Sequence, residues 1–421
     1  MSNFQAIYQF HFHNVGQGLF YTGQIEDFLF VYDCGSRSLT SVVRAIDRWF
    51  SMYSSSKSTI DVLVISHLDN DHVSGLDYLL GRMSAKLVIM PYVSHFERML
   101  LALRATRVPD WYVSFIKDPV DYLLGTQKIA RIILVLPAGE EYEREGLAGP
   151  FRENDFANEH WEFRDELWRV LEPMLEEEKE ETRQRWRTHL SGGKLRFRTH
   201  HGRVVPVAEW EFRFFVQKVE DSCLQKFRDC LHNLCNASEL QEILRCKSKR
   251  NRVRKCYKYI IGTNNRLNAT SLVLYHGPLN RARSITVECS NNIVFSYYPL
   301  RYCNAPEHCP GCLATLLSTL GAGQLLMGDL DLTKNYNDFS NHMRSELQST
   351  ALCLLPHHGS ENSWEPTLMN DASKCHLWVA SAGINNKRNR HPSPLVIHDI
   401  LKNGNAFFWV NELTGLSLVY C

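Results

Sequence analysis

The sequence predicts an α/β fold in which a largely helical insertion divides one layered domain. Short β-type runs alternate with helical stretches in residues 1–150 and again in residues 259–421, which is the pattern of a layered α/β domain. Between these two parts, residues 151–258 segregate their acidic and basic side chains into separate runs. A connection of this length is too long for a plain loop, so we expect the insertion to have structure of its own.

The expected elements of the two parts follow from the short apolar runs. In the first part we expect strands at 28–32, 60–65 and 87–90 and helices at 41–53 and 73–83. In the second part, strand-like runs lie at 270–274, 285–297, 324–327, 352–355, 377–380 and 416–419.

Charge segregation defines the insertion. Residues 153–181 carry 12 acids and 3 bases, and their Glu-rich sequence with spaced Leu and Trp favours a helix. Residues 183–203 carry 7 bases and no acid, and residues 245–258 carry 8 bases and no acid. Such runs either bind a polyanion or pair with one another inside the insertion.

The overall composition excludes several classes of protein. With 421 residues, of which 44% are hydrophobic and 22% charged, the chain is neither disordered nor fibrous. The 47 basic and 46 acidic residues leave a formal charge of +1, so any argument for a polyanion partner must be local. The odd number of 13 cysteines suits a reducing compartment. No secretory signal and no apolar run of about 20 residues is present, so we expect a cytoplasmic protein without membrane contact.

The strongest local signal directly follows the expected strand 60–65. His67, Asp69, Asp71 and His72 offer four potential metal ligands within six residues. At a strand end that leads into a helix, these side chains can converge on one point that solvent still reaches. The alternative is a polar loop of solvated side chains.

Further candidate ligands follow strands of the second part. Asp329 comes after the apolar run 325–327 and Gly328, although such an Asp alone could be a helix N-cap. His357 and His358 follow the next strand, and His391 precedes Pro392 after one more strand. The sequence therefore places imidazoles and carboxylates repeatedly at the carboxyl ends of strands.

Together these residues resemble the metallo-β-lactamase fold superfamily, and within it the soluble hydrolase domain of ComEC-type DNA-uptake proteins. The resemblance covers residues 6 to about 90 and 265 to 421. His67-x-Asp69-x-Asp71-His72 resembles the HxDxDH signature of these domains. The other motifs follow in the family's order: Val15-Gly16-Gln17-Gly18, Tyr32-Asp33-Cys34-Gly35, Gly328-Asp329, Pro356-His357-His358-Gly359-Ser360 and His391-Pro392. The resemblance implies a four-layer αββα sandwich.

The resemblance also implies a binuclear metal site. By position, Asp71, His72 and His358 would hold one ion, His67 and Asp69 would help to hold the other, and Asp329 would bridge, with Asp33 behind the ligands. The chain departs from the wider superfamily in having Asp69 in place of a second His. It also has only Asn268-Ala269-Thr270-Ser271-Leu272 where a third-motif His usually stands. Because this ligand set is rich in oxygen, the two divalent ions could be Zn or Mn.

The implied reaction is hydrolysis. A two-metal site suits a phosphodiester, so we expect a DNA or RNA nuclease that could serve nucleic-acid turnover or defence. Asp71 and Asp33 belong to the expected catalytic set with His357 and His391, which could donate a hydrogen bond or a proton. His391 could instead fix the turn at Pro392. Two other functions remain open: hydrolysis of a small ester, lactone or cyclic nucleotide, and a partner-binding module of this fold with weak turnover.

Two motifs outside this site could bind further ligands. The run containing Lys249, Arg250, Arg252, Arg254 and Lys255 could follow a nucleic-acid backbone, or it could pair with the acidic run 153–181. The insertion could equally bind a protein partner. A possible structural Zn site in the loop 303–312 comprises Cys303, His308, Cys309 and Cys312, with Cys289 as an alternative to His308 and free thiols as the alternative to zinc.

Overall fold

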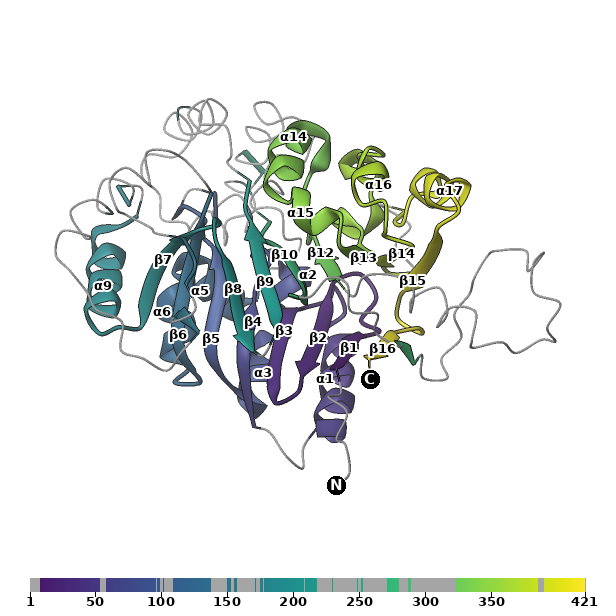
Figure 1. Cartoon of the computed structure of the whole chain (residues 1–421). Coiled ribbons are helices and arrows are strands. Elements are labelled where there is room, and N and C mark those ends of the chain that lie inside the picture. Colours follow the sequence, from purple (N-terminus) through teal and green to yellow (C-terminus); the bar gives the residue numbers. More distant parts are fainter. Residues whose placement is uncertain are drawn as a thin grey trace, which may run out of the picture.

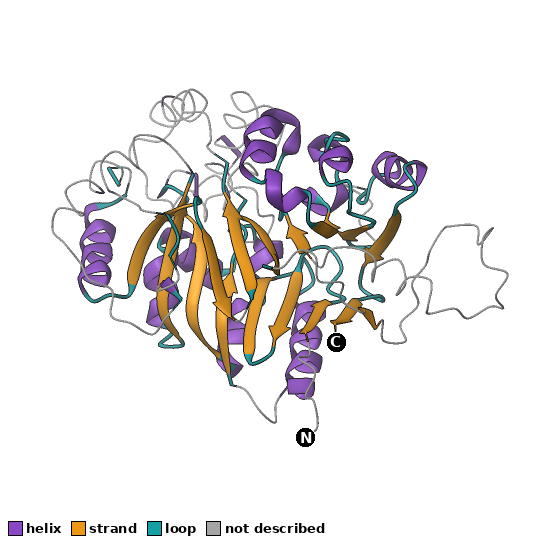
Figure 2. Cartoon of the chain, in the orientation of Figure 1, coloured by secondary structure: helices purple, strands orange, loops and turns teal. Residues whose placement is uncertain are grey.

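Two β-sheets face each other at the centre of the molecule (Figure 1, Figure 2). The computed structural model describes residues 8–53, 58–95, 109–137, 178–207, 209–217, 271–279, 323–384 and 390–420, with short stretches between them. None of the helices within these ranges combines the length and apolar character that a bilayer span needs.

The first sheet has nine strands in the order β11-β16-β1-β2-β3-β4-β5-β6-β7. Strands β3 to β7 run parallel to one another, whereas β1, β2 and β16 pair antiparallel. The strands are β1 (Tyr8–Phe12), β2 (Phe20–Ile25), β3 (Phe28–Cys34), β4 (Thr59–Val64), β5 (Ser84–Pro91), β6 (Ile129–Leu136), β7 (Leu195–Thr199), β11 (Val287–Glu288) and β16 (Leu416–Tyr420).

The second sheet has seven strands in the order β15-β14-β13-β12-β10-β9-β8. Strands β12 to β15 are parallel, and β8, β9 and β10 complete the sheet with antiparallel pairs. The strands are β8 (Arg203–Val207), β9 (Trp210–Phe215), β10 (Val273–Pro278), β12 (Gly323–Leu326), β13 (Thr350–Leu354), β14 (Leu377–Ser381) and β15 (Ala406–Val410).

Three hydrophobic clusters define four layers. One cluster lies between the sheets, one between the first sheet and its helices, and one between the second sheet and its helices. This is the αββα sandwich that the resemblance implies, and the fold prediction is confirmed. The first sheet is covered by α1 (Leu39–Tyr53), α3 (Leu76–Arg82), α5 (Asp110–Lys117), α6 (Pro119–Gly125) and α9 (Glu180–Ser191), and the second by α14 (Leu332–His342), α15 (Arg344–Leu347), α16 (Leu368–Asp371) and α17 (Pro394–Lys402).

A small polar network crosses the core between the sheets. The Tyr21 hydroxyl donates to Gln324 Oε1 (2.9 Å) and contacts His276 Nε2 (2.9 Å), and Trp210 Nε1 donates to His276 Nδ1 (3.3 Å). Because Trp210 donates to Nδ1, the neutral His276 ring carries its proton on Nε2 and donates to Tyr21. Burial lowers the pKa of His276 from its ordinary 6.5 to about 3, which keeps the ring neutral.

The structure corrects the prediction for residues 195–215, which belong to the sheets and not to a helical insertion. In β7, Leu195 and Phe197 are buried and alternate with Arg196 and Arg198 on the other face. Both arginines bond the buried Asp155, at 2.6 and 2.7 Å. In this part of the basic run the arginines therefore reflect strand alternation, and an acid from the acidic run pairs with both of them.

Candidate metal centre

The carboxyl ends of parallel strands from both sheets converge on one site. In the first sheet, Asp33 ends β3, and the loop from Ser66 to α2 (Asn70–Val73) follows β4. In the second sheet, Asp329 follows β12, and His357 and His358 follow β13 in the short 3₁₀ segment η3 (Pro356–Gly359). Since parallel strands end at the same edge, residues from both halves of the chain meet here.

Asp33 is a buried anchor behind the site. It accepts hydrogen bonds from the Ser66 amide (2.6 Å), from Ser66 Oγ (2.5 Å) and from His72 Nδ1 (2.7 Å). Because the Ser66 hydroxyl proton points to Asp33, Ser66 Oγ accepts from His67 Nδ1 (2.8 Å). One carboxylate thus fixes the orientation of two imidazole rings.

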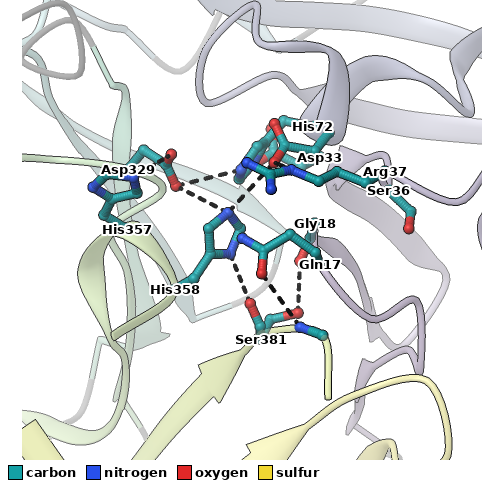
Figure 3. Close-up of polar contacts among 12 residues, drawn as sticks. Gln17, Gly18, Asp33, Ser36, Arg37, His72, Asp329, His357, His358 and Ser381 are labelled. Carbon is teal, nitrogen blue, oxygen red and sulfur yellow. Dashed lines mark hydrogen bonds and ion pairs between the residues drawn. The ribbon is translucent and has the colours of Figure 1, made fainter. Parts of the chain in front are cut away.

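A third ring is held from the second sheet. His358 Nδ1 donates to the carbonyl oxygen of Ser381 at the end of β14 (2.7 Å), and Ser381 Oγ donates to Gly18 O (2.7 Å). Figure 3 shows His72 and His358 directed at Asp329 from different sides. In all three rings Nδ1 is engaged, so the Nε2 lone pairs of His67, His72 and His358 are turned toward the site.

Asp329 lies at the centre of these rings. Its carboxylate oxygens are 3.4 Å from His72 Nε2, 3.6 Å from His358 Nε2 and 3.7 Å from both His67 Nε2 and His357 Nε2. These separations are too long for hydrogen bonds. They are close to the separation of about 3.3 Å between two ligands of one tetrahedral zinc ion.

The surroundings shift the pKa of three of the buried groups. Burial would raise the pKa of Asp329, but His358, His357, His72 and His67 hold it well below its ordinary range. Burial would lower the pKa of His72, yet Asp329 and Asp33 raise it well above its ordinary value. For His67, burial and the neighbouring His72 keep the pKa well below the ordinary value. The site thus binds positive charge strongly and leaves at least one ring unprotonated.

Left-handed backbone is concentrated around this centre. Asp33 (φ 57°), His357 (φ 46°) and His358 (φ 58°) adopt positive φ, which L residues rarely do. Gly328 (φ 53°) precedes Asp329, and a Cβ at Gly328 would lie 2.9 Å from the Ser66 side chain. Glycine here lets β12 approach the loop after β4, which brings Asp329 onto the rings of the first sheet.

The donor set is suited to binding metal. Within the described ranges, His67 Nε2, His72 Nε2, His358 Nε2 and Asp329 Oδ1 are buried and form no hydrogen bond. Three groups here have ligand atoms within 4.8 Å of one another: Asp71 with His72 and His358, His67 with Asp69 and Asp329, and Asp33 with His67 and His72. In the last group, Asp33 already accepts hydrogen bonds from His72 and Ser66. Imidazole and carboxylate ligands together suit Zn and Mn.

The helix-cap alternatives do not apply to Asp69 and Asp329. Asp69 occupies the N-cap position of α2, but its side chain makes no capping hydrogen bond there. The N-cap of α14 is Asp331, which accepts from the Thr333 amide (3.1 Å), and not Asp329. Both acids therefore lie at the site without the local role that a cap would give them.

The remaining predicted site residues lie at the rim. His357 Nδ1 pairs with Ser363 Oγ (3.1 Å), and the rings of His357 and His391 are 5.5 Å apart. Burial and then His358 and His357 lower the pKa of His391 to about 3, so its ring is neutral near pH 7.

Sequence reasoning missed four residues of the site. Ser66 and Ser381 hold the rings of the histidines, and the Ser271 hydroxyl accepts from the Asp329 amide (3.2 Å) at the place where a third-motif His was sought. Arg37, with 51% of its side chain exposed, has Nε 3.3 Å from Asp71 Oδ2. Of these four residues, only Ser66 could have been suspected from the sequence, because it directly precedes His67. The other three lie in segments that are distant in sequence from the motif at 67–72.

Several predicted sites lie outside the described residues. This is so for the cysteine site in the loop 303–312 and for most of the basic run, of which only Arg252 is described, as an exposed helical residue. The residues outside the described ranges are Cys303, His308, Cys309, Cys312, Lys249, Arg250, Arg254 and Lys255.

Comparison with known proteins adds little to this geometry. No protein-family model and no curated protein matches the chain. Among solved structures, it is similar to the metallo-β-lactamase fold protein YhfI from Bacillus subtilis, at 7% identity over 98% of this chain and 100% of that chain, with a TM-score of 0.35. A structure described as the peroxy diiron species of chemotaxis sensor ODP matches at 16% identity over 47% of this chain and 84% of that chain, with a TM-score of 0.19. Similarity at this level carries no argument, so the description rests on the sheet order and the contacts.

Proposed function

We propose that this chain is a binuclear metal-dependent hydrolase of phosphodiesters, with DNA or RNA as its substrate. The observation that carries the proposal is the orientation of three buried imidazoles, which have Nδ1 engaged and Nε2 directed to Asp329 without a hydrogen bond. Buried polar atoms left in this way are expected where an ion belongs.

The ligands divide into two sets around Asp329. Asp71, His72 and His358 would hold one ion, His67 and Asp69 would hold the other, and Asp329 would serve both. When bound, two divalent ions lower the pKa of a water molecule and neutralise the charge that develops on the oxygens of a phosphodiester. The carboxylate share of this set makes Mn a candidate beside Zn.

The chain's own residues would position the substrate and the protons. The oxygen of a water molecule would bond to phosphorus, the ester P–O bond would break, and the proton that the water releases would pass through solvent to the leaving oxygen. The neutral ring of His391 can offer one N–H hydrogen bond to a phosphoryl or leaving oxygen, and the half-exposed guanidinium of Arg37 can contact a phosphate oxygen beside Asp71.

A phosphodiester suits this rim better than an uncharged ester does. Arg37 is a positive group on the open side of a site whose other charges are carboxylates and imidazoles, and it is the group that would distinguish an anionic substrate. The motif resemblance to ComEC-type hydrolase domains supports nucleic acid as that substrate. We assign an auxiliary role to the insertion, where exposed Arg252 could contact the nucleic-acid backbone or a protein partner.

Labelled single- and double-stranded DNA and RNA, incubated with Mn²⁺ or Zn²⁺, test the proposal. Wild-type protein should cleave at least one of them, Asp71→Ala and Asp329→Ala should not, and Asp331→Asn should retain activity because Asp331 caps α14. Metal-dependent turnover of only a lactone, a small ester or a cyclic nucleotide would replace the substrate class. Metal bound at less than one ion per chain, with no turnover, would instead support a partner-binding module.

A further inference from the structure

A second group of histidines lies apart from the proposed hydrolase site. We call His200, His201 and His342 the histidine triad; their ligand nitrogens all lie within 4.8 Å of one another. His200 and His201 directly follow β7 of the first sheet, and His342 ends α14 on the second. The triad shares no residue with the ligand groups around Asp329.

The three rings form one compact group. Ring centroids are 4.3 Å apart for His200 and His342, 5.0 Å for His200 and His201, and 5.2 Å for His201 and His342. None of the three ring pairs is parallel, since the interplanar angles lie between 49° and 76°. Nitrogens of three such rings can face a common point, which a flat stack would prevent.

Backbone groups of β9 orient two of the rings. His342 Nε2 is 3.0 Å from Phe214 O and, since a carbonyl only accepts, Nε2 carries the proton and the Nδ1 lone pair is left for a ligand bond. His200 Nδ1 lies 3.0 Å from Val216 N, whose N–H donates to Nδ1 when Nδ1 is unprotonated, and 2.9 Å from Val216 O, to which Nδ1–H donates when it is protonated. When Nδ1–H donates to Val216 O, the Nε2 lone pair of His200 is available. Backbone carbonyls commonly fix metal-binding imidazoles in this way.

The structure assigns to the histidine triad a second metal site, for a divalent transition ion that prefers imidazole nitrogen, such as zinc. Zinc bonds three histidines at about 2.0–2.1 Å, which requires the nitrogens to be about 3.3 Å apart. The nitrogens of the triad lie within 4.8 Å of one another, so the rings would draw together when they bind an ion. No carboxylate belongs to the group, which disfavours Mg²⁺ and Ca²⁺.

The groups around the histidine triad keep two of its rings unprotonated, which is the form of an imidazole that binds a metal ion. Burial, His342 and His201 lower the pKa of His200 to about 2, and burial, Arg213 and His201 lower that of His342 to about 3. Arg213 donates to His342 O (3.3 Å) and lies 3.8 Å from the buried Glu346, which offsets its charge. An ion here would join the edge of the first sheet to α14 and β9 of the second, so it would also act as a clip between the two sheets.

Zinc content of the full-length, untagged protein tests the assignment. Protein loaded with Zn²⁺ and freed of excess metal by dialysis is analysed by elemental mass spectrometry. His342→Gln should lose about one zinc ion per chain, because a glutamine can still donate to Phe214 O but offers no imidazole. His398→Gln, on α17, is the matched control and should lose none.

The same pair of variants in an Asp329→Asn background separates this site from the hydrolase site. Zinc that persists in Asp329→Asn and disappears when His342→Gln or His201→Gln is added supports the triad, whatever the substrate of the other site. Thermal melts in EDTA check folding, because the triad variants should then melt like their parent. Equal zinc content with and without His342→Gln, in both backgrounds, overturns the assignment.

Discussion

The two histidine clusters of this molecule differ in the charged groups that surround their imidazole rings. Around Asp329, three imidazoles lie among the carboxylates of Asp69, Asp71 and Asp329, with Asp33 behind them. The histidine triad contains no carboxylate, and the nearby charge is that of Arg213, which Glu346 offsets only at 3.8 Å. Carboxylates raise the pKa of His72 well above its ordinary value, although burial opposes that rise, whereas burial and like charge lower the pKa of His342.

This difference shows what carboxylates add to a cluster of imidazoles. Acids compensate the charge of two ions and provide a group that can bridge them, which a hydrolytic site needs. Three neutral rings can hold one ion, but they leave its charge uncompensated and provide no group that could bridge to a second ion. Charge, more than the number of histidines, should therefore separate the two clusters in function.

The largest effect is expected from Asp329→Ala. Removal of the one carboxylate that faces four imidazoles should lower kcat/KM for the proposed nucleic-acid substrate at least about 100-fold, because the transition state of the metal-dependent step loses several kcal/mol of stabilisation. Steady-state cleavage with saturating Mn²⁺ or Zn²⁺ measures this. Asp331→Asn, two residues further along, should stay within a few-fold of wild type. Similar activity in both variants would contradict the central role of Asp329.

A second expected effect concerns the anchor behind the rings. Asp33→Asn should weaken metal binding about 10- to 100-fold, because the amide cannot accept from both Ser66 and His72 as the carboxylate does. Asparagine tolerates the left-handed backbone at this position, so the fold should be kept. Competition with a chromophoric chelator measures the affinity.

The control for this variant is Asp61→Asn. Asp61 lies in β4 and pairs with Lys86, away from the rings. If Asp61→Asn weakens metal binding as much as Asp33→Asn does, the effect of Asp33 is not one of ring orientation.

A buried histidine outside both clusters should determine part of the acid sensitivity. The pKa of His276 is about 3 in the folded chain and 6.5 when unperturbed, so only the unfolded chain takes up the proton in between. Its neutral form stabilises the fold fully above pH 6.5, and this stability is lost as pH falls toward 3, by about 2 kcal/mol between pH 7 and pH 5. Urea unfolding of metal-free wild type and His276→Gln at both pH values measures the contribution. An equal loss of stability in the two proteins would show that His276 has no such role.

The smallest effect is expected from Arg37→Ala. A half-exposed arginine contributes at most about 1 kcal/mol, so KM should rise about fivefold while kcat changes little. Arg37→Lys should restore part of the loss and increase its dependence on salt. Kinetics at two salt concentrations decide the matter: a fall in kcat with KM unchanged would assign Arg37 to the reacting atoms instead of substrate binding.

Much of the fold and of the candidate site could be predicted from sequence. Strands β3, β4, β12 and β13 carry their polar motifs directly at their carboxyl ends, and short apolar runs identify such strands well. The prediction was wrong for β7, β8 and β9. In β7, arginines on the polar face of the strand look like a solvated basic run, and only their pairing with Asp155 reveals their place.

The sequence by itself determined which chemical groups are present and where strands release them. Ligand type is a property of each residue, and the placement of His67, His72 and His358 after apolar runs follows from local patterns. The tertiary structure decided which nitrogen of each ring faces the site. That choice depends on partners distant in sequence, such as Ser381 for His358 and Asp33 for His72. It also decided that His342 meets His200 and His201, because contacts between sheets have no trace in local sequence.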